Sequence, residues 1–154
     1  MKIIYLNTWG GKLLEPLEQF LKKHHDVDVF CFQEIWNDAP SFVADKGEYP
    51  HLFTHLGTIL NDYEKIFSPA EEGDSFGLAM YYHKSLLKIS DDNFMIHNKK
   101  EYFPQGNVTA PKRNLQSITF QVEDDQKFTI INFSVSNCIY ICFLLLIFFT
   151  CNNK

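Results

Sequence analysis

The sequence predicts an α/β fold that begins with a strand–helix–strand unit and continues as antiparallel hairpins. Two apolar runs, near residues 2–7 and 27–32, flank a stretch with helical periodicity, all within about 35 residues. Further along, short apolar segments are separated by a few polar turn residues, as in antiparallel hairpins. A chain of 154 residues is expected to form one domain.

The first strand, Lys2–Asn7, is apolar and ends in a side-chain amide. Thr8-Trp9-Gly10-Gly11 follows, and its glycines can take the positive φ of a tight turn. Pro16 then lies in what would be the first helical turn, where proline is tolerated. Apolar residues recur at helical spacing through this stretch, at Leu13, Leu14, Leu17, Phe20 and Leu21.

The second strand, Val27–Phe32, is apolar apart from Asp28 and ends in Gln33-Glu34. A carboxylate at the exit of a buried strand is costly unless it is paired or holds a metal. A crossover helix makes the two strands parallel, so Asn7 and Glu34 are expected on one rim of the sheet. Their oxygens suit Mg²⁺, which often takes only one or two protein ligands. The alternative is that Glu34 only caps the next turn.

Residues 37–75 are rich in proline and glycine and are predicted to be mainly loop, with a short strand near Leu52–Thr54. His51 and His55 are four residues apart. Because no further ligand follows at helical spacing, they are interpreted as surface or packing histidines rather than a metal pair.

The remaining strands are predicted from apolar runs and from partial alternation. They are Ser75–His83, two edge strands at Leu86–Ile89 and Asn93–His97 with a turn at 90–92, and a hairpin of Asn114–Glu123 with Lys127–Phe133.

Charge and cysteine content limit the classes of function. The net charge of −5 and the presence of only short basic pairs do not favour a protein that coats DNA, because such binding neutralises many phosphates. The four cysteines, Cys31, Cys138, Cys142 and Cys151, have no metal-ligand spacing. The chain starts directly with a strand, so we expect no secretory leader, reduced cysteines and a cytoplasmic or intracellular location.

The segment from Leu6 to Gly11, followed by Asp28–Trp36, resembles the start of the endonuclease/exonuclease/phosphatase superfamily, the deoxyribonuclease-I-like metal-dependent phosphoesterases. The resemblance implies a four-layer α/β sandwich. It implies catalytic and metal-site roles for Glu34, as ligand of Mg²⁺ or Mn²⁺, and for Asn7 beside the metal and phosphate. Arg113 and Asn132 match the family's layout near the phosphate. The implied substrates are phosphoesters of nucleic acids, phosphoinositides or other phospholipids.

The resemblance ends near residue 134. The family has a histidine where this sequence has Ser134, and the Asp-x-Asn motif, further aspartate and Asp-His pair expected after it do not occur in residues 135–154. Residues 1–134 are therefore predicted to be the N-terminal portion of a truncated phosphoesterase domain. Such a portion is expected to bind metal weakly and to have no appreciable hydrolytic activity.

Two interpretations are open for the apolar tail, residues 135–154. As a helix, residues 138–151 would reach about 21 Å, short of a bilayer core of about 30 Å, so they would form at most a short membrane anchor. The tail also contains no Gly, Ala, Pro or Arg, and Val135-Ser136 can be encoded by an intron start, so our hypothesis is that it is a translated intron.

Two further functions follow as alternatives to the phosphoesterase prediction. An anchored tail would make the chain a non-catalytic interaction protein on the same scaffold. A nucleotide-binding protein using Trp9-Gly10-Gly11 as a phosphate loop is disfavoured, because neither G-x-G-x-x-G nor a P-loop lysine follows the strand.

Overall fold

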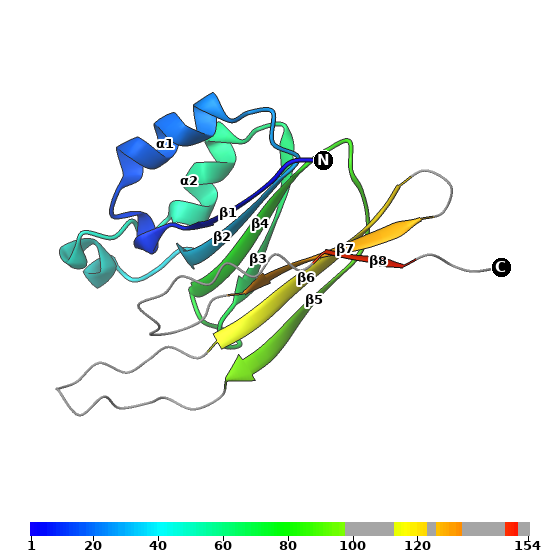
Figure 1. Cartoon of the computed structure of the whole chain (residues 1–154). Helices are drawn as coiled ribbons and strands as arrows, with labels where there is room; N and C mark the ends of the chain where they lie inside the picture. Colours follow the sequence, from blue (N-terminus) through cyan, green and yellow to red (C-terminus); the bar gives the residue numbers. More distant parts are fainter. Residues whose placement is uncertain (98–112, 123–125, 134–146, 151–154) are drawn as a thin grey trace, which may run out of the picture.

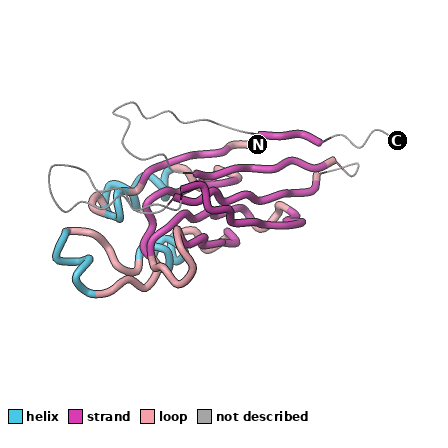
Figure 2. Tube along the Cα trace, turned by 90° about the horizontal axis from the view of Figure 1, so that it is seen from below, coloured by secondary structure: helices cyan, strands magenta, loops and turns pink. Residues whose placement is uncertain are grey.

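The computed structural model describes residues 1–97, 113–122, 126–133 and 147–150, which form two four-stranded sheets. The first sheet has the order β1-β2-β4-β3, with β1 at Ile3–Asn7, β2 at Val29–Trp36, β3 at Tyr63–Pro69 and β4 at Phe76–His83. The second has the order β5-β6-β7-β8, with β5 at Leu87–His97, β6 at Arg113–Gln121, β7 at Lys127–Phe133 and β8 at Ile147–Thr150. Viewed from below, the strands occupy the centre of the molecule (Figure 2).

The helices α1 (Leu14–Lys23) and α2 (Leu52–Ile59) cover one face of the first sheet, and the second sheet packs against the other face (Figure 1). Alternation along β2 explains this arrangement. Phe30 and Phe32 belong to the core on the helix side, whereas Val29 and Cys31 belong to the core between the sheets. The predicted α/β sandwich is confirmed, as three of its four layers in the part of the chain that the structure describes.

The strand–helix–strand unit is confirmed in detail. β1 pairs with β2 in parallel, with Asn7 opposite Gln33, and α1 connects the two strands. Leu17 and Leu21 of α1 are buried four residues apart, as the helical spacing predicts. The short 3-10 helix η1 (Trp9–Gly11) forms the turn between β1 and α1, and η2 (Ser41–Lys46) lies in the loop after β2.

Two predictions for residues 37–75 are wrong. The segment predicted as a short strand, Leu52–Thr54, begins helix α2, because Leu52 and Leu56 both bury against the sheet at helical spacing. β3 was predicted as loop. Its burial does not alternate regularly, since the edge of the sheet exposes Glu64 and Lys65 in succession, so no period of two is visible in the sequence.

The two edge strands predicted around residues 90–92 form one continuous strand, β5. The polar residues there do not make a turn; they accompany a shift in the register against β6 between Lys88 and Ser90. A β-bulge of this kind admits a local irregularity without ending the strand. The predicted hairpin of β6 and β7 is confirmed, and the buried side chains of β6 alternate as expected.

Part of the apolar tail belongs to the second sheet. β8 pairs antiparallel with Lys127–Ile130 of β7. The other residues of the predicted anchor, 138–146 and 151, lie outside the described residues, as do Ser134 and the cysteines at 138, 142 and 151. Within the described ranges, no helix has both the length and the apolar character needed to cross a membrane.

Candidate functional site

Thr8 joins the carboxyl ends of β1 and β2. Its backbone N–H and its hydroxyl each lie 3.0 Å from the carbonyl oxygen of Gln33, and the hydroxyl also lies 2.9 Å from that of Glu34. Thr8 is itself buried, so these bonds are shielded from water. They place Asn7 and Glu34 side by side, and Nδ2 of Asn7 donates to Oε1 of Glu34 over 2.9 Å. The structure therefore brings together the two residues that the sequence places on one rim.

The Asn7 amide has a defined orientation. The backbone N–H of Trp9 donates to Oδ1 of Asn7 over 2.9 Å. Since an N–H can only donate, the amide oxygen must face Trp9 and the NH₂ group must face Glu34. Asn7 thus holds one oxygen of the Glu34 carboxylate at the rim.

A β-bulge turns Glu34 toward the rim. Between Phe32 and Ile35, β2 advances three residues while β4 advances two, from Ala79 to Gly77. The extra residue lets Phe32 and Ile35 both enter the core on the helix side, although a regular strand would place them on opposite faces. Glu34 takes up the irregularity with a φ of +59°.

Left-handed backbone is concentrated at this end of the sheet. Among the residues that the structure describes, the non-glycine residues with positive φ are Trp9, Glu34 and Asp38, at +53°, +59° and +52°. Trp9 and Asp38 each lie two residues beyond the end of β1 and β2, respectively. Such residues cost of order 1–3 kcal/mol each and cluster where a fixed geometry serves function.

Arg113, at the start of β6, brings a positive charge within electrostatic range of the rim. Burial lowers the pKa of its half-buried guanidinium, and the charge of Glu34 acts in the opposite direction. The guanidinium remains protonated in either case, because arginine does not lose its proton in proteins. Asn7, Glu34 and Arg113 therefore combine an amide, a carboxylate and a cation.

Asn132, which the family layout placed near the phosphate, lies beneath the rim and is fully buried. Its Nδ2 donates to the carbonyl oxygens of Phe32 and Ala79, over 3.0 and 3.2 Å, and its Oδ1 accepts from Nε2 of Gln33 over 2.6 Å. It thus fixes the backbone next to Glu34. A phosphate contact by Asn132 stays a prediction.

Asn132 is part of a wider set of amides between the two sheets, which we call the amide seam. Its members are Gln33, Asn93, Asn114, Gln116 and Asn132. Asn114 donates to the Ser68 carbonyl over 3.1 Å and to Oδ1 of Asn93 over 2.8 Å, and Gln116 donates to the Ile66 carbonyl over 3.1 Å. Sequence reasoning missed this set. The signal was a pair of polar residues, 114 and 116, in phase with buried Ile118 and Phe120.

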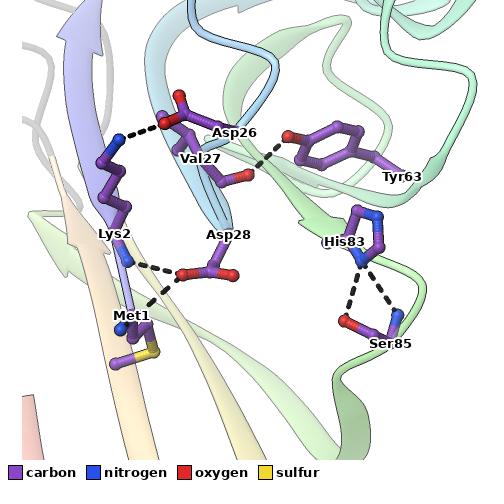
Figure 3. Close-up of polar contacts among 8 residues, drawn as sticks. All are labelled: Met1, Lys2, Asp26, Val27, Asp28, Tyr63, His83 and Ser85. Atoms are coloured by element: carbon purple, nitrogen blue, oxygen red, sulfur yellow. Dashed lines mark hydrogen bonds and ion pairs between the residues drawn. The ribbon is translucent and has the colours of Figure 1, made fainter.

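The opposite end of β1 and β2 carries a different polar cluster, shown in Figure 3. The backbone N–H of Lys2 donates to Oδ2 of Asp28 over 2.6 Å, and the amino group of Met1 lies 3.8 Å from the same oxygen. The Lys2 ammonium pairs with Asp26, and the Tyr63 hydroxyl donates to the Val27 carbonyl. The carboxylates at this end are neutralised by neighbouring cations.

The histidines at 51 and 55 contact different partners. Nδ1 of His51 lies 2.9 Å from Oδ1 of Asp38, and Nε2 of His55 lies 2.7 Å from Oε1 of Glu18. This agrees with their interpretation as packing histidines. More generally, no three His, Cys, Asp or Glu side chains within the described ranges gather as a metal cage. Among the described residues, a cation at the rim would therefore have fewer than three such ligands, with Glu34 as one of them.

An α/β sandwich with a carboxylate and an amide converging at the ends of parallel strands defines a class of ligand-binding folds. Within that class, the sequence matches the Endonuclease/Exonuclease/phosphatase family over residues 4–122, and the chain belongs to this family. No curated protein sequence matched it.

Solved structures with the same fold include members of this family. An endonuclease/exonuclease/phosphatase from Bacteroides vulgatus superposes with a TM-score of 0.59 at 16% identity, covering 85% of this chain and 51% of the other. A humanized D. rerio TDP2 gives 0.57 at 17%, covering 89% and 51%. A mannosyl-6-phosphatase from Bacteroides thetaiotaomicron gives 0.54 at 18%, covering 80% and 43%. The chain thus spans about half the length of these structures or less.

Proposed function

We propose that this chain binds a phosphoester together with one divalent cation at the rim of Asn7 and Glu34, and that it does not hydrolyse the ester appreciably. The observation that supports the proposal is the 2.9 Å hydrogen bond between Asn7 and Glu34, which fixes a carboxylate at the carboxyl ends of two parallel strands. Membership of the Endonuclease/Exonuclease/phosphatase family is consistent with a phosphoester ligand, as is the fold shared with a mannosyl-6-phosphatase.

The residues at the rim fit a hard cation such as Mg²⁺ or Mn²⁺. Mg²⁺ is commonly held by one or two carboxylates together with water and substrate phosphate oxygens, and Glu34 supplies one carboxylate there. When bound, the cation would polarise the phosphoester and offset its negative charge. With one protein carboxylate, we expect the cation to bind weakly until a phosphate joins it.

The hydrogen bonds suggest separate roles for the other residues. Asn7 is predicted from the family as a second metal-site residue. Its oxygen faces the Trp9 N–H and its NH₂ group faces Glu34, so we assign this NH₂ group to holding Glu34 and to donating its second N–H to a phosphate oxygen. Arg113 supplies positive charge for the phosphate, and Asn132 positions the backbone beside Glu34.

The proposal that turnover is negligible rests on the sequence. Ser134 stands where the family has a phosphate-binding histidine, and no Asp-x-Asn motif follows it in this chain. A positioned general base contributes about 10²–10⁴-fold to rate and one electrostatic donor about 10²–10³-fold. A rim that lacks this base and this histidine is expected to bind its ligand rather than turn it over.

The test is Mn²⁺ binding to the purified full chain, followed by electron paramagnetic resonance with and without dimethyl phosphate. We expect the diester to tighten Mn²⁺ binding, and Glu34→Gln to abolish that effect. Asp28→Asn, at the opposite end of β2, is the matched control and should leave it unchanged. Mn²⁺ binding that is indifferent to Glu34→Gln would overturn the metal site. Mg²⁺-dependent hydrolysis of a generic diester, lost in Glu34→Ala, would overturn the absence of turnover.

A further inference from the structure

We propose that Trp9 is a stacking platform that binds a nucleobase attached to the phosphate at the rim, so that the preferred ligands are mononucleotides. This inference rests on the proposed phosphate site and adds the class of group bound next to it. It is drawn from the exposure, backbone strain, rigidity and position of Trp9.

The exposure and backbone of Trp9 are both unfavourable to the folded chain. The residue is 62% exposed, although tryptophan is among the most strongly buried side chains on average. Its φ of +53° lies in the left-handed region that favours glycine, and two glycines follow directly. A large aromatic residue kept exposed in a strained conformation indicates a role outside the core.

Trp36 makes a useful comparison because its indole has a structural role. Its Nε1 donates to Oε2 of Glu48 over 2.7 Å, and its ring lies 4.6 Å from that of Phe76. Trp36 is thus integrated into the protein, whereas most of Trp9 faces solvent. The two tryptophans therefore differ: Trp36 is packed against its neighbours, and Trp9 is exposed to solvent.

The turn that carries Trp9 is rigid. Its own backbone closes it, since Gly11 N–H donates to the Thr8 carbonyl over 2.9 Å. Tyr49 N–H donates to the Gly10 carbonyl over 2.8 Å, and a Cβ added at Gly10 would lie 2.9 Å from Oε2 of Glu48. The segment at 48–49 thus packs tightly against the turn, and a ligand meeting Trp9 would not have to order it.

Two hydrogen bonds connect Trp9 to the Glu34 carboxylate. The Trp9 N–H donates to Asn7, and Asn7 donates to Glu34. The Trp9 backbone therefore lies only two hydrogen bonds away from the carboxylate at which the phosphoester is proposed to bind. A planar ring suits an exposed indole best, since bases stack on aromatic side chains with little dependence on their sequence. A net charge of −5 favours a single nucleotide over a long polyanion.

The experiment compares AMP with ribose 5-phosphate, both in Mg²⁺, by calorimetry on the full chain. The two ligands share the phosphate and the sugar and differ in the base. We expect AMP to bind more tightly, by about 5- to 150-fold, the contribution of one stacked base. Trp9→Gly, which suits a positive φ and should fold, is expected to remove this preference, and Trp9→Tyr is expected to restore part of it. Phe42→Ala, at another exposed aromatic residue, should leave it unchanged.

Fluorescence gives an independent readout. In a Trp36→Phe background Trp9 is the sole tryptophan, and AMP should quench its emission while ribose 5-phosphate should not.

The outcomes separate the two proposals. Equal binding of both ligands, dependent on Mg²⁺ and Glu34, would overturn the platform and leave the phosphate site standing. A preference for AMP that survives Trp9→Gly would also overturn the platform. Failure of both ligands to bind would overturn both proposals. A preference for AMP that requires Trp9 but neither Mg²⁺ nor Glu34 would support the platform and overturn the metal-dependent site.

Discussion

The two ends of β1 and β2 show opposite ways of placing polar groups where buried strands begin and end. At the amino end, Asp26 and Asp28 are neutralised by Lys2 and the terminal amine, and the backbone is ordinary (Figure 3). At the carboxyl end, Glu34 is held by a neutral amide, and its own backbone is left-handed. The first arrangement pairs the carboxylates with nearby cations, whereas the second holds a carboxylate through a neutral amide, with the charge of Arg113 acting on it from β6, and the proposed cation site rests on this second arrangement.

The carboxyl end needs support because its backbone is strained. The amide seam provides it from below: Asn132 bonds to the Phe32 carbonyl and to Gln33, the two residues that precede Glu34. At the amino end the corresponding space between the sheets is filled by apolar side chains, including Val29, Tyr82 and Phe120. The layer between the sheets is thus polar beneath the rim and apolar away from it.

The largest expected effect comes from removing this support. Asn132→Leu would leave the Gln33 amide and the Phe32 and Ala79 carbonyls short of a buried partner, at about 1–3 kcal/mol for each unsatisfied group. We expect the free energy of unfolding to fall by about 3–5 kcal/mol, measured by urea denaturation.

The matched control for Asn132→Leu is Ile130→Val, a neighbouring buried position on the same face of β7. It removes one methyl group and should cost about 0.5–1.5 kcal/mol. If Asn132→Leu costs no more than this control, the seam does not stabilise the rim.

A smaller effect distinguishes the backbones at the two ends. Glu34→Ala and Glu34→Gly both remove the carboxylate, so their difference reports the conformation alone. Because φ is +59°, the glycine variant should be more stable by about 1 kcal/mol. At Asp28, where φ is not positive, the order should reverse, with alanine more stable by about 0.5–1 kcal/mol. Thermal unfolding of the four variants measures both differences, and the same order at both sites would contradict the contrast.

The sequence predicted the rim because parallel strands joined by a helix must end side by side, which placed Asn7 beside Glu34 without any knowledge of side chains. It could not predict the bulge, since its signature is that Phe32 and Ile35 share a face. The amide seam also escaped prediction. Asn114 and Gln116 resemble surface residues until the carbonyls of the facing strand are known.

Helix α2 and the turn at Trp9 show a second limit of prediction from the sequence. The sequence predicts a short strand near Leu52–Thr54, but burial of Leu56 one turn after Leu52 selects a helix. Tertiary packing overrode local propensity there. At Trp9 the glycines at 10 and 11 indicated the turn, yet the tryptophan also has a positive φ, which no residue preference suggests.

The smallest effect concerns the ion pair at the amino end. Lys2 donates to Asp26 and lowers the pKa of that carboxyl in the folded state. A depressed pKa stabilises the fold above the unfolded-state pKa, and this contribution is lost as the pH falls through the folded value. Asp26→Asn should therefore make stability less dependent on pH as the pH falls below about 5 and through the folded pKa, measured as the shift in urea midpoint. Since the pair is exposed, the change should be small and should shrink in high salt.

Lys2→Met should reproduce this loss of pH dependence, and the Asp26→Asn, Lys2→Met double variant should add nothing to it. An additive double variant would mean that the two charges act independently, so that Asp26 is not neutralised by Lys2 and the contrast with Glu34 loses its basis.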